Sequence, residues 1–214
     1  MSVTNDCDKA ETADAPDAPP GPRVLVHTRR DRELAAATWL LLAAPDSTTA
    51  RYEWNAYGLA LLRCGGLFSA VRIPAGLVHA AAGTETREGV ATFLTDALAG
   101  GAVFHDAGGR QYYALTPAST ARMWRLTEAE CLGEDAFLGV PATDLTAPDP
   151  RCTAHWVVPM AGPAALCMPG DVARLVLTAR DLAATRHQAT HPATADRRST
   201  RGNRTNLTLP PLRS

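Results

Sequence analysis

The stretch Ala102–Pro117, AVFHDAGGRQYYALTP, shows the pattern that decides the fold. Two short apolar runs, Ala102–His105 and Gln111–Thr116, flank a turn sequence at Asp106–Gly109, which predicts a β-hairpin. Because proline cannot donate to a sheet ladder, it marks strand ends and edges. The second run ends at a proline, and three other apolar runs do the same: SAVRIP (Ser69–Pro74), FLGVP (Phe137–Pro141) and HWVVP (His155–Pro159). These runs predict a small, mostly antiparallel sheet whose strands leave into loops, where binding residues tend to lie.

Helical and strand patterns occur in clumps on both sides of this hairpin. Leu59–Arg63 and Leu67–Ile73 flank Gly65-Gly66, which predicts another hairpin, and Thr127 and Glu130 have the spacing of a helix capping box. Clumps without strict βαβ alternation predict an α+β fold: a single domain with a mostly antiparallel sheet of hairpins and flanking helices. Helices are expected from Thr28 to Pro45, from Asp46 or Ser47 to Gly58, over Gly76–Ala82, from about Val90 to Leu98, and from Pro169 onward.

The distribution of charge divides the chain into three parts. Residues 1–22 hold five acidic residues against Lys9 and little to bury, so we predict a disordered acidic tail. Residues 185–214 hold six arginines against Asp196, and we predict a disordered Arg-rich tail there. Residues 23–184 are predicted to form the α+β globular domain. The net charge of −1 leaves this middle part near neutrality, so weak nucleic-acid affinity is expected only through the C-terminal tail.

Composition also argues against several reaction classes. Lys9 is the only lysine, so the predicted domain has none for a Schiff base, a P-loop or a Ser-x-x-Lys pair. The five cysteines form no C-x-x-C pair, and we expect no cofactor. The N-terminus lacks a signal-peptide pattern, and the longest apolar stretch, Leu34–Ala44, is too short to cross a bilayer. We expect a cytoplasmic protein without membrane contact.

Three candidate ligand-binding residues lie in the hairpin. His105, with Asp106 beside it, could act as a general base or a metal ligand, although Asp followed by Ala-Gly-Gly is ordinary turn chemistry. Tyr112 and Tyr113 must point to opposite faces of the sheet, because side chains alternate along a strand. One ring is expected in the core, and the other could stack on a base or sugar.

Three further candidates carry a positive charge or an aromatic ring. Arg72, inside an apolar strand, either reaches solvent or directs its guanidinium at an anion. Arg122 and Trp124 follow Ser119-Thr120 and could form a loop that holds phosphate beside an aromatic platform. The alternative is a helix that packs Trp124 inward and leaves the arginine in solvent.

The histidines offer two arrangements that a metal site could use. His105 and His155 lie in different predicted strands, so they could share a metal only if those strands were neighbours, and no spacing argument brings them together. His187 and His191 have the i, i+4 spacing of a helix-borne metal pair, but they lie in the tail predicted to lack helix. We therefore predict no metal ligands.

Four segments carry a resemblance to other proteins: Gly65–Gly83, Gly100–Thr120, Cys131–Pro141 and His155–Cys167. They resemble small uncharacterised actinobacterial proteins of the streptomycete type. More distantly, FLGVP followed by an apolar VVP segment resembles the non-catalytic framework of actinobacterial primase/polymerase N-terminal domains. That family's chemistry needs paired carboxylates for two metal ions, and the acidic-x-acidic pair is absent from the predicted strands. The resemblance implies a related sheet rather than polymerase activity.

The leading hypothesis is a non-catalytic module that binds a ligand or a partner. An anionic or nucleotide-like small molecule fits Arg72, Arg122, Trp124 and Tyr112 best. A degenerate primase/polymerase-like enzyme is one alternative, and it requires Asp106, Glu128 or Asp135 to converge in one cleft. A structural or regulatory domain for protein–protein interaction is another.

Overall fold

The computed structural model describes residues 28–190 of the chain, and side chains as far as Thr185. The predictions for residues 1–22 and for residues 191–214, with His191, lie outside the described residues. Within residues 28–190 the fold is α+β, with six helices and two antiparallel sheets. The helices are α1 (Arg29–Leu41), α2 (Ser47–Tyr57), α3 (Ala75–Ala82), α4 (Arg87–Ala97), α5 (Thr120–Met123) and α6 (Pro169–Thr190). The strands are β1 (Leu59–Arg63), β2 (Phe68–Pro74), β3 (Val103–Asp106), β4 (Gln111–Pro117), β5 (Glu130–Leu132), β6 (Phe137–Pro141) and β7 (Ala154–Val158).

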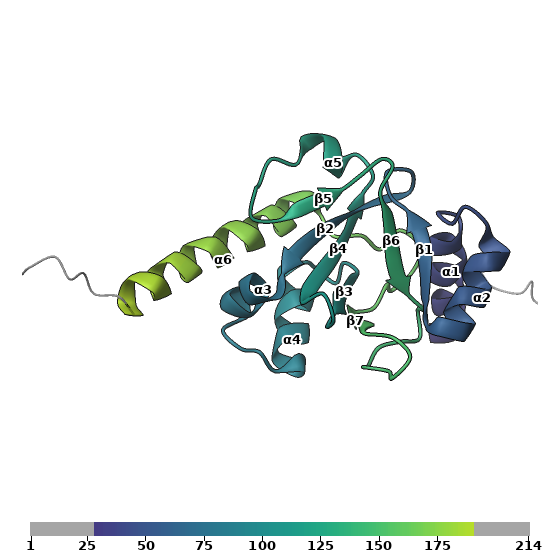
Figure 1. Ribbon diagram of the computed structural model, residues 1–214, viewed down its shortest axis with the longest axis horizontal. Helices are drawn as coiled ribbons and strands as arrows, with labels where there is room; N and C mark the ends of the chain where they lie inside the picture. The colour runs from purple at the N-terminus through teal and green to yellow at the C-terminus, as the bar shows by residue number, and fades with distance from the viewer. Residues whose placement is uncertain (1–27, 191–214) are drawn as a thin grey trace, which may run out of the picture.

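A five-stranded sheet with the order β5-β2-β4-β3-β7 lies at the centre of the fold. Its two faces belong to separate apolar cores. One core contains Phe68, Phe104 and Trp156, and the ribbon β1–β6 with α1 and α2 covers it. The other contains Ile73 and Tyr112 and lies under α3, α4 and the start of α6. Figure 1 shows α1 and α2 on one side of the molecule and α3, α4 and α6 on the other.

Local sequence signals explain most element boundaries. Thr28 and Asp31 form a capping box at the start of α1, and the Asp46 side chain caps α2. Gly58, at φ 71°, ends α2 in the left-handed conformation that glycine adopts at helix C-termini. The hairpin predicted at Ala102–Thr116 is present as β3 and β4. No helix among the described residues is long and apolar enough to span a membrane.

The hairpin predicted around Gly65-Gly66 is wrong. β1 pairs with β6, whereas β2 pairs with β4 and β5. The physical reason is burial on both faces: β2 places Phe68 in one core and Ile73 in the other, so it takes a central position between two partners. The chain therefore crosses from one sheet to the other at the glycines.

Two other expectations also fail. No helix starts at Thr127, because Glu130 instead begins β5 and pairs with Arg72 at the edge of the sheet. Helix α6 continues to Thr190, so the backbone of residues 185–190, with His187, is helical where the tail was predicted to lack helix.

Candidate functional site

The strands that carry His105 and His155 are neighbours. β3 and β7 pair in antiparallel fashion, and the register places His105 directly opposite His155. The two imidazole rings lie with their centroids 5.7 Å apart in an edge-to-face arrangement. The condition for a shared site, that the two strands are neighbours, is therefore met. The sequence could not show this, because the paired residues lie 50 positions apart.

Two more side chains extend this row of rings. Tyr112 on β4 is opposite His105 in the register, and their rings stack at 4.3 Å between centroids. His79, on α3, places its Nε2 atom 3.2 Å from the Tyr112 hydroxyl. Tyr113 lies on the other face and stacks on Phe104, which confirms that the two tyrosines point to opposite sides of the sheet.

These rings line a cavity of about 260 Å³ between the sheet and the start of α4. The register shifts between Val103 and Phe104, so that β7 contains an extra residue, Val157, whose side chain also lines the cavity. Such bulges often redirect a side chain beside a binding site. The remaining lining residues are Glu85, Arg87, Val90, Ala107 and Pro148.

One basic and one acidic side chain contribute charge to the cavity lining. The Arg87 guanidinium donates a hydrogen bond to the carbonyl oxygen of Thr146, in the loop that leads to β7. The Glu85 carboxylate lies 3.9 Å from Nδ1 of His79 and is largely exposed. The cavity therefore has imidazole and phenol walls, with one guanidinium and one carboxylate among the groups around it.

Burial keeps the imidazoles of His105 and His155 uncharged at neutral pH. The pKa of His105 is lowered to about 4, first by burial and then by the neighbouring His155 and His79, against the opposing effect of Asp106. The pKa of His155 is also lowered, first by burial and then by the positive charge of Arg87. Burial raises the pKa of the Tyr112 hydroxyl.

His155 shows the feature of the cavity that protein packing does not explain. Its side chain is only 4% exposed, and its Nδ1 atom has no hydrogen-bond partner within the protein. Leaving a buried polar atom unpaired costs about 1–3 kcal/mol. Because most buried polar groups are paired, an exception beside a cavity indicates a place where a ligand atom or water supplies the bond.

The opposed histidines do not extend to a metal centre. The part of the chain that the structure describes contains no group of three or more His, Cys, Asp or Glu side chains placed to hold a metal ion. Asp106, next to His105, accepts hydrogen bonds from the Thr153 hydroxyl at 2.8 Å and the Gly108 amide at 3.1 Å. It therefore has the turn role that its sequence context predicted.

Of the six candidate residues, His105 and Tyr112 line the cavity, with Asp106 at the adjacent turn. Arg72 lies on the opposite face, where it forms an ion pair with Glu130. Arg122 pairs with Glu134 at 2.5 Å. Trp124 donates its indole hydrogen to the carbonyl oxygen of Ala129 and packs against the core under α6. The structure therefore does not bring Arg72, Arg122 and Trp124 together with Tyr112 in one anion-binding site.

Sequence reasoning missed His79, Glu85 and Arg87. His79 stands in a short apolar helix, where a single histidine is typical of ordinary packing. Arg87 begins α4 just after the N-cap Thr86, and its position gives no hint of an inward role. Only the packing of α3 and α4 on the sheet brings these residues to Tyr112 and His155.

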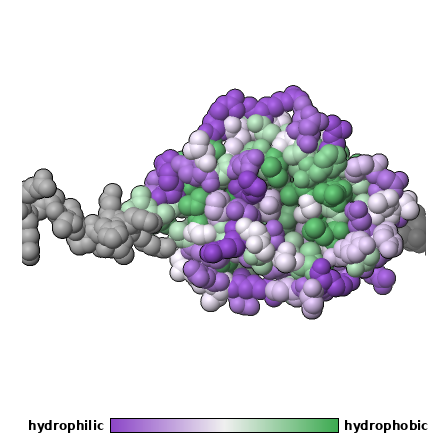
Figure 2. All heavy atoms as spheres, in the orientation of Figure 1, coloured by the Kyte–Doolittle hydropathy of each residue, from purple (hydrophilic) through white to green (hydrophobic). Residues whose placement is uncertain are grey.

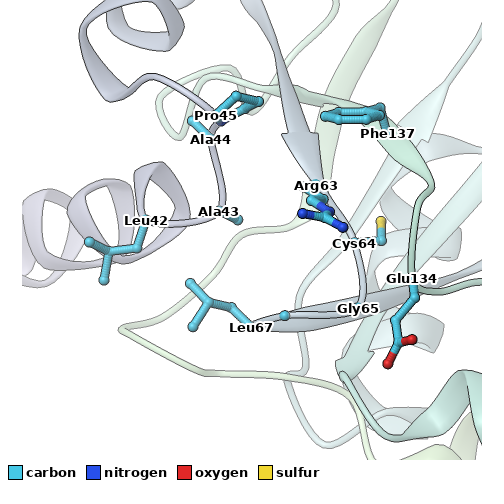
Figure 3. Close-up of a pocket in the computed structure, with 11 residues that line it drawn as sticks. Leu42, Ala43, Ala44, Pro45, Arg63, Cys64, Gly65, Leu67, Glu134 and Phe137 are labelled. Atoms are coloured by element: carbon cyan, nitrogen blue, oxygen red, sulfur yellow. The ribbon is translucent and has the colours of Figure 1, made fainter.

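A larger hollow of about 460 Å³ lies elsewhere, between the α1–α2 connection and the start of β6. Figure 3 shows Leu42 and Leu67 on one side of it and Phe137 and Cys64 on the other. Its arginine, Arg63, is paired with Asp135 at 3.0 Å, and burial raises the pKa of the Cys64 thiol to about 11. This hollow is apolar, with an unreactive thiol and a charge that already has a partner.

Exposed apolar side chains gather near that hollow. Phe137 on β6 and Leu61 on β1 are more than half exposed, and Leu42 at the end of α1 is 70% exposed. In Figure 2 a green area covers the outer face of the β1–β6 ribbon.

The three carboxylates required by the primase/polymerase alternative have separate partners. Asp106 binds Thr153, Glu128 pairs with Arg180 of α6 at 3.2 Å, and Asp135 pairs with Arg63. Their convergence in one cleft is not observed.

Comparisons with known proteins assign no family. No protein-family model, no curated protein and no solved structure matches the chain. The function therefore has to be argued from the cavity itself.

Proposed function

We propose that this protein is a non-catalytic module that binds a small ring-containing ligand with an anionic group, of the nucleotide-like or aromatic-acid type, in the His79–His105–Tyr112–His155 cavity. The observation that carries the proposal is the buried, unpartnered Nδ1 of His155 beside a cavity that three imidazoles and a phenol line. Flat polar rings with few charges make good contacts for a flat polar ligand.

The volume of the cavity supports a ligand about one ring in size. An engineered apolar cavity of about 150 Å³ holds benzene, and the cavity here measures about 260 Å³. Arg87 supplies a cationic group, and a guanidinium carries five N–H donors, of which the structure gives one to Thr146. A ring beside Tyr112 and His105 with an acid group toward Arg87 fits this arrangement.

The electrostatics favour binding over catalysis. A general acid or base works best with a pKa near the operating pH. The pKa of His105 is about 4, and burial moves the pKa of Tyr112 above its ordinary value. Neither group is poised to exchange a proton with a substrate at neutral pH.

The test is a thermal-shift and calorimetric screen of the full chain against nucleobases, nucleosides, nucleoside monophosphates and single-ring aromatic acids. A ligand at 100 times its Kd adds about 2.7 kcal/mol, which for a domain of this size shifts Tm by about 5–10 °C. The shift is expected to disappear in Arg87→Gln and to persist in Arg122→Gln, whose arginine pairs with Glu134 and is not part of the cavity lining. A panel in which nothing binds would remove the proposal.

A further inference from the structure

The imidazole of His155 and the guanidinium of Arg87 together indicate the charge of the ligand. Arg87 on α4 is near enough to His155 on β7 to affect its protonation, and both side chains line the cavity. An anion placed between them would contact two groups that otherwise repel each other when both are positive. The titratable or charged groups around His155 are His105 and Asp106 on β3, Tyr112 on β4, His79 on α3, Glu85 before α4, and Arg87 on α4.

The same surroundings limit how much negative charge the cavity accepts. The cavity lining contains one guanidinium, that of Arg87, and one carboxylate, that of Glu85, which lies beside His79. The imidazoles of His105 and His155 are uncharged at neutral pH. A phosphate dianion would find one guanidinium and a nearby carboxylate. A carboxylate carries a single charge, which one guanidinium can match in bidentate geometry. The size of the cavity, about 260 Å³, favours one ring over a whole nucleotide.

Resting on the function proposed above, we infer that the ligand is a single-ring carboxylic acid whose carboxylate lies between Arg87 and His155, and that its binding is coupled to the uptake of one proton by His155. In the free protein His155 is a neutral imidazole. In the complex an imidazolium and a guanidinium flank the carboxylate, and solvent supplies the proton. Neutral rings of the same shape lack the charge that draws this proton in.

The coupling follows from charge linkage. Arg87 and burial oppose the charged form of His155 in the free protein. A bound carboxylate offsets the repulsion from Arg87 and favours the imidazolium, so the pKa of His155 rises in the complex. Affinity therefore increases as pH falls, by at most tenfold per pH unit for one proton.

The experiment measures the Kd of the full chain for benzoate and for the uncharged benzamide by calorimetry at pH 7.5, 6.5 and 5.5. Benzoate is expected to bind at least tenfold more tightly at pH 5.5 than at pH 7.5, while benzamide changes less than twofold. Calorimetry in two buffers of different ionisation enthalpy is expected to show proton uptake with benzoate alone. This readout uses the unaltered protein, so it does not depend on a variant's folding.

Two matched variants locate the proton. His155→Gln is expected to reduce the pH dependence of benzoate binding to less than twofold. Arg122→Gln, which removes an exposed ion pair with Glu134 outside the cavity lining, is expected to retain it. The assignment is overturned if His155→Gln keeps the full dependence, or if benzamide shows the same dependence as benzoate. If nucleotides bind and benzoate does not, the inference fails while the binding function stands. If no ring compound binds at any pH, both fail.

Discussion

Acidification is expected to destabilise this fold through His105. The imidazole stacks on Tyr112 and faces His155, and its pKa in the folded protein is about 4 against 6.5 for the ordinary side chain. Because the folded-state pKa is lowered, the unfolded chain binds more protons at acidic pH. The stabilising contribution of the neutral imidazole is therefore fully present above about pH 6.5 and is lost as pH falls toward 4.

The size of the effect follows from the difference between the two pKa values. At pH 5 the unfolded side chain is almost fully protonated, and the folded one remains mostly neutral. The difference of about 1.5 pH units between 6.5 and 5 corresponds to about 2 kcal/mol at 1.36 kcal/mol per unit. For a domain of this size, that loss lowers Tm by about 4–8 °C. His155, whose pKa is also lowered, adds to the loss in the same direction.

Urea unfolding of the full chain at pH 7 and pH 5 measures this loss directly. In His105→Gln the group no longer titrates, so the difference in unfolding free energy between the two pH values is expected to shrink by about 2 kcal/mol. Arg174→Gln, which removes an exposed ion pair with Asp171 on α6, serves as the control and is expected to keep the full loss. Equal stability of the unaltered protein at pH 5 and pH 7 would refute the reasoning, as would an undiminished loss in His105→Gln.

Two further predictions concern the crossing between the sheets and the buried thiols. Gly65→Ala is expected to lower the free energy of unfolding in urea by about 1–3 kcal/mol, because φ there is 88° and a Cβ would lie 2.6 Å from the Glu134 backbone. Gly66→Ala, where a Cβ meets nothing within 4 Å, is expected to change it by no more than about 0.5 kcal/mol. Equal effects at both positions would contradict this assignment. Burial raises the thiol pKa of Cys64 to about 11 and that of Cys167 to about 12. Both thiols are therefore expected to react with iodoacetamide at pH 8 only after unfolding, which peptide mass spectrometry measures. Rapid labelling of the native protein would contradict their buried positions.

The sequence predicts the parts of the fold that depend on neighbouring residues. The Ala102–Thr116 hairpin forms because its turn and its alternating side chains lie within one short segment. The pairing of β1 with β6 joins Leu59 to Pro141, and no local pattern specifies such a partner. Gly65-Gly66 has the sequence of a hairpin turn, whereas in the fold Gly65 permits the chain to pass close to the backbone of Glu134. The sequence therefore indicates that the chain turns at these glycines, but not which strands pair on either side of them.

Of the candidate site, too, only the local features could be predicted from the sequence. Alternation along β4 places Tyr112 and Tyr113 on opposite faces, and this could be stated from the sequence. The register then continues each tyrosine into a different row across the sheet. Tyr113 continues through Phe104 to Trp156 in the packed core, whereas Tyr112 continues through His105 to His155 under α3 and α4.

The two rows show why the cavity is the better candidate. In the row of Trp156, the indole nitrogen donates to the carbonyl oxygens of Pro141 and Ala142, so the polar atom of a buried ring is satisfied by the fold itself. In the neighbouring row, on the same strand, His155 is equally buried but its Nδ1 has no such partner. Protein packing accounts for the first residue and not for the second. The row of imidazoles therefore contains a buried hydrogen-bonding atom, beside the cavity, that no described protein group pairs with.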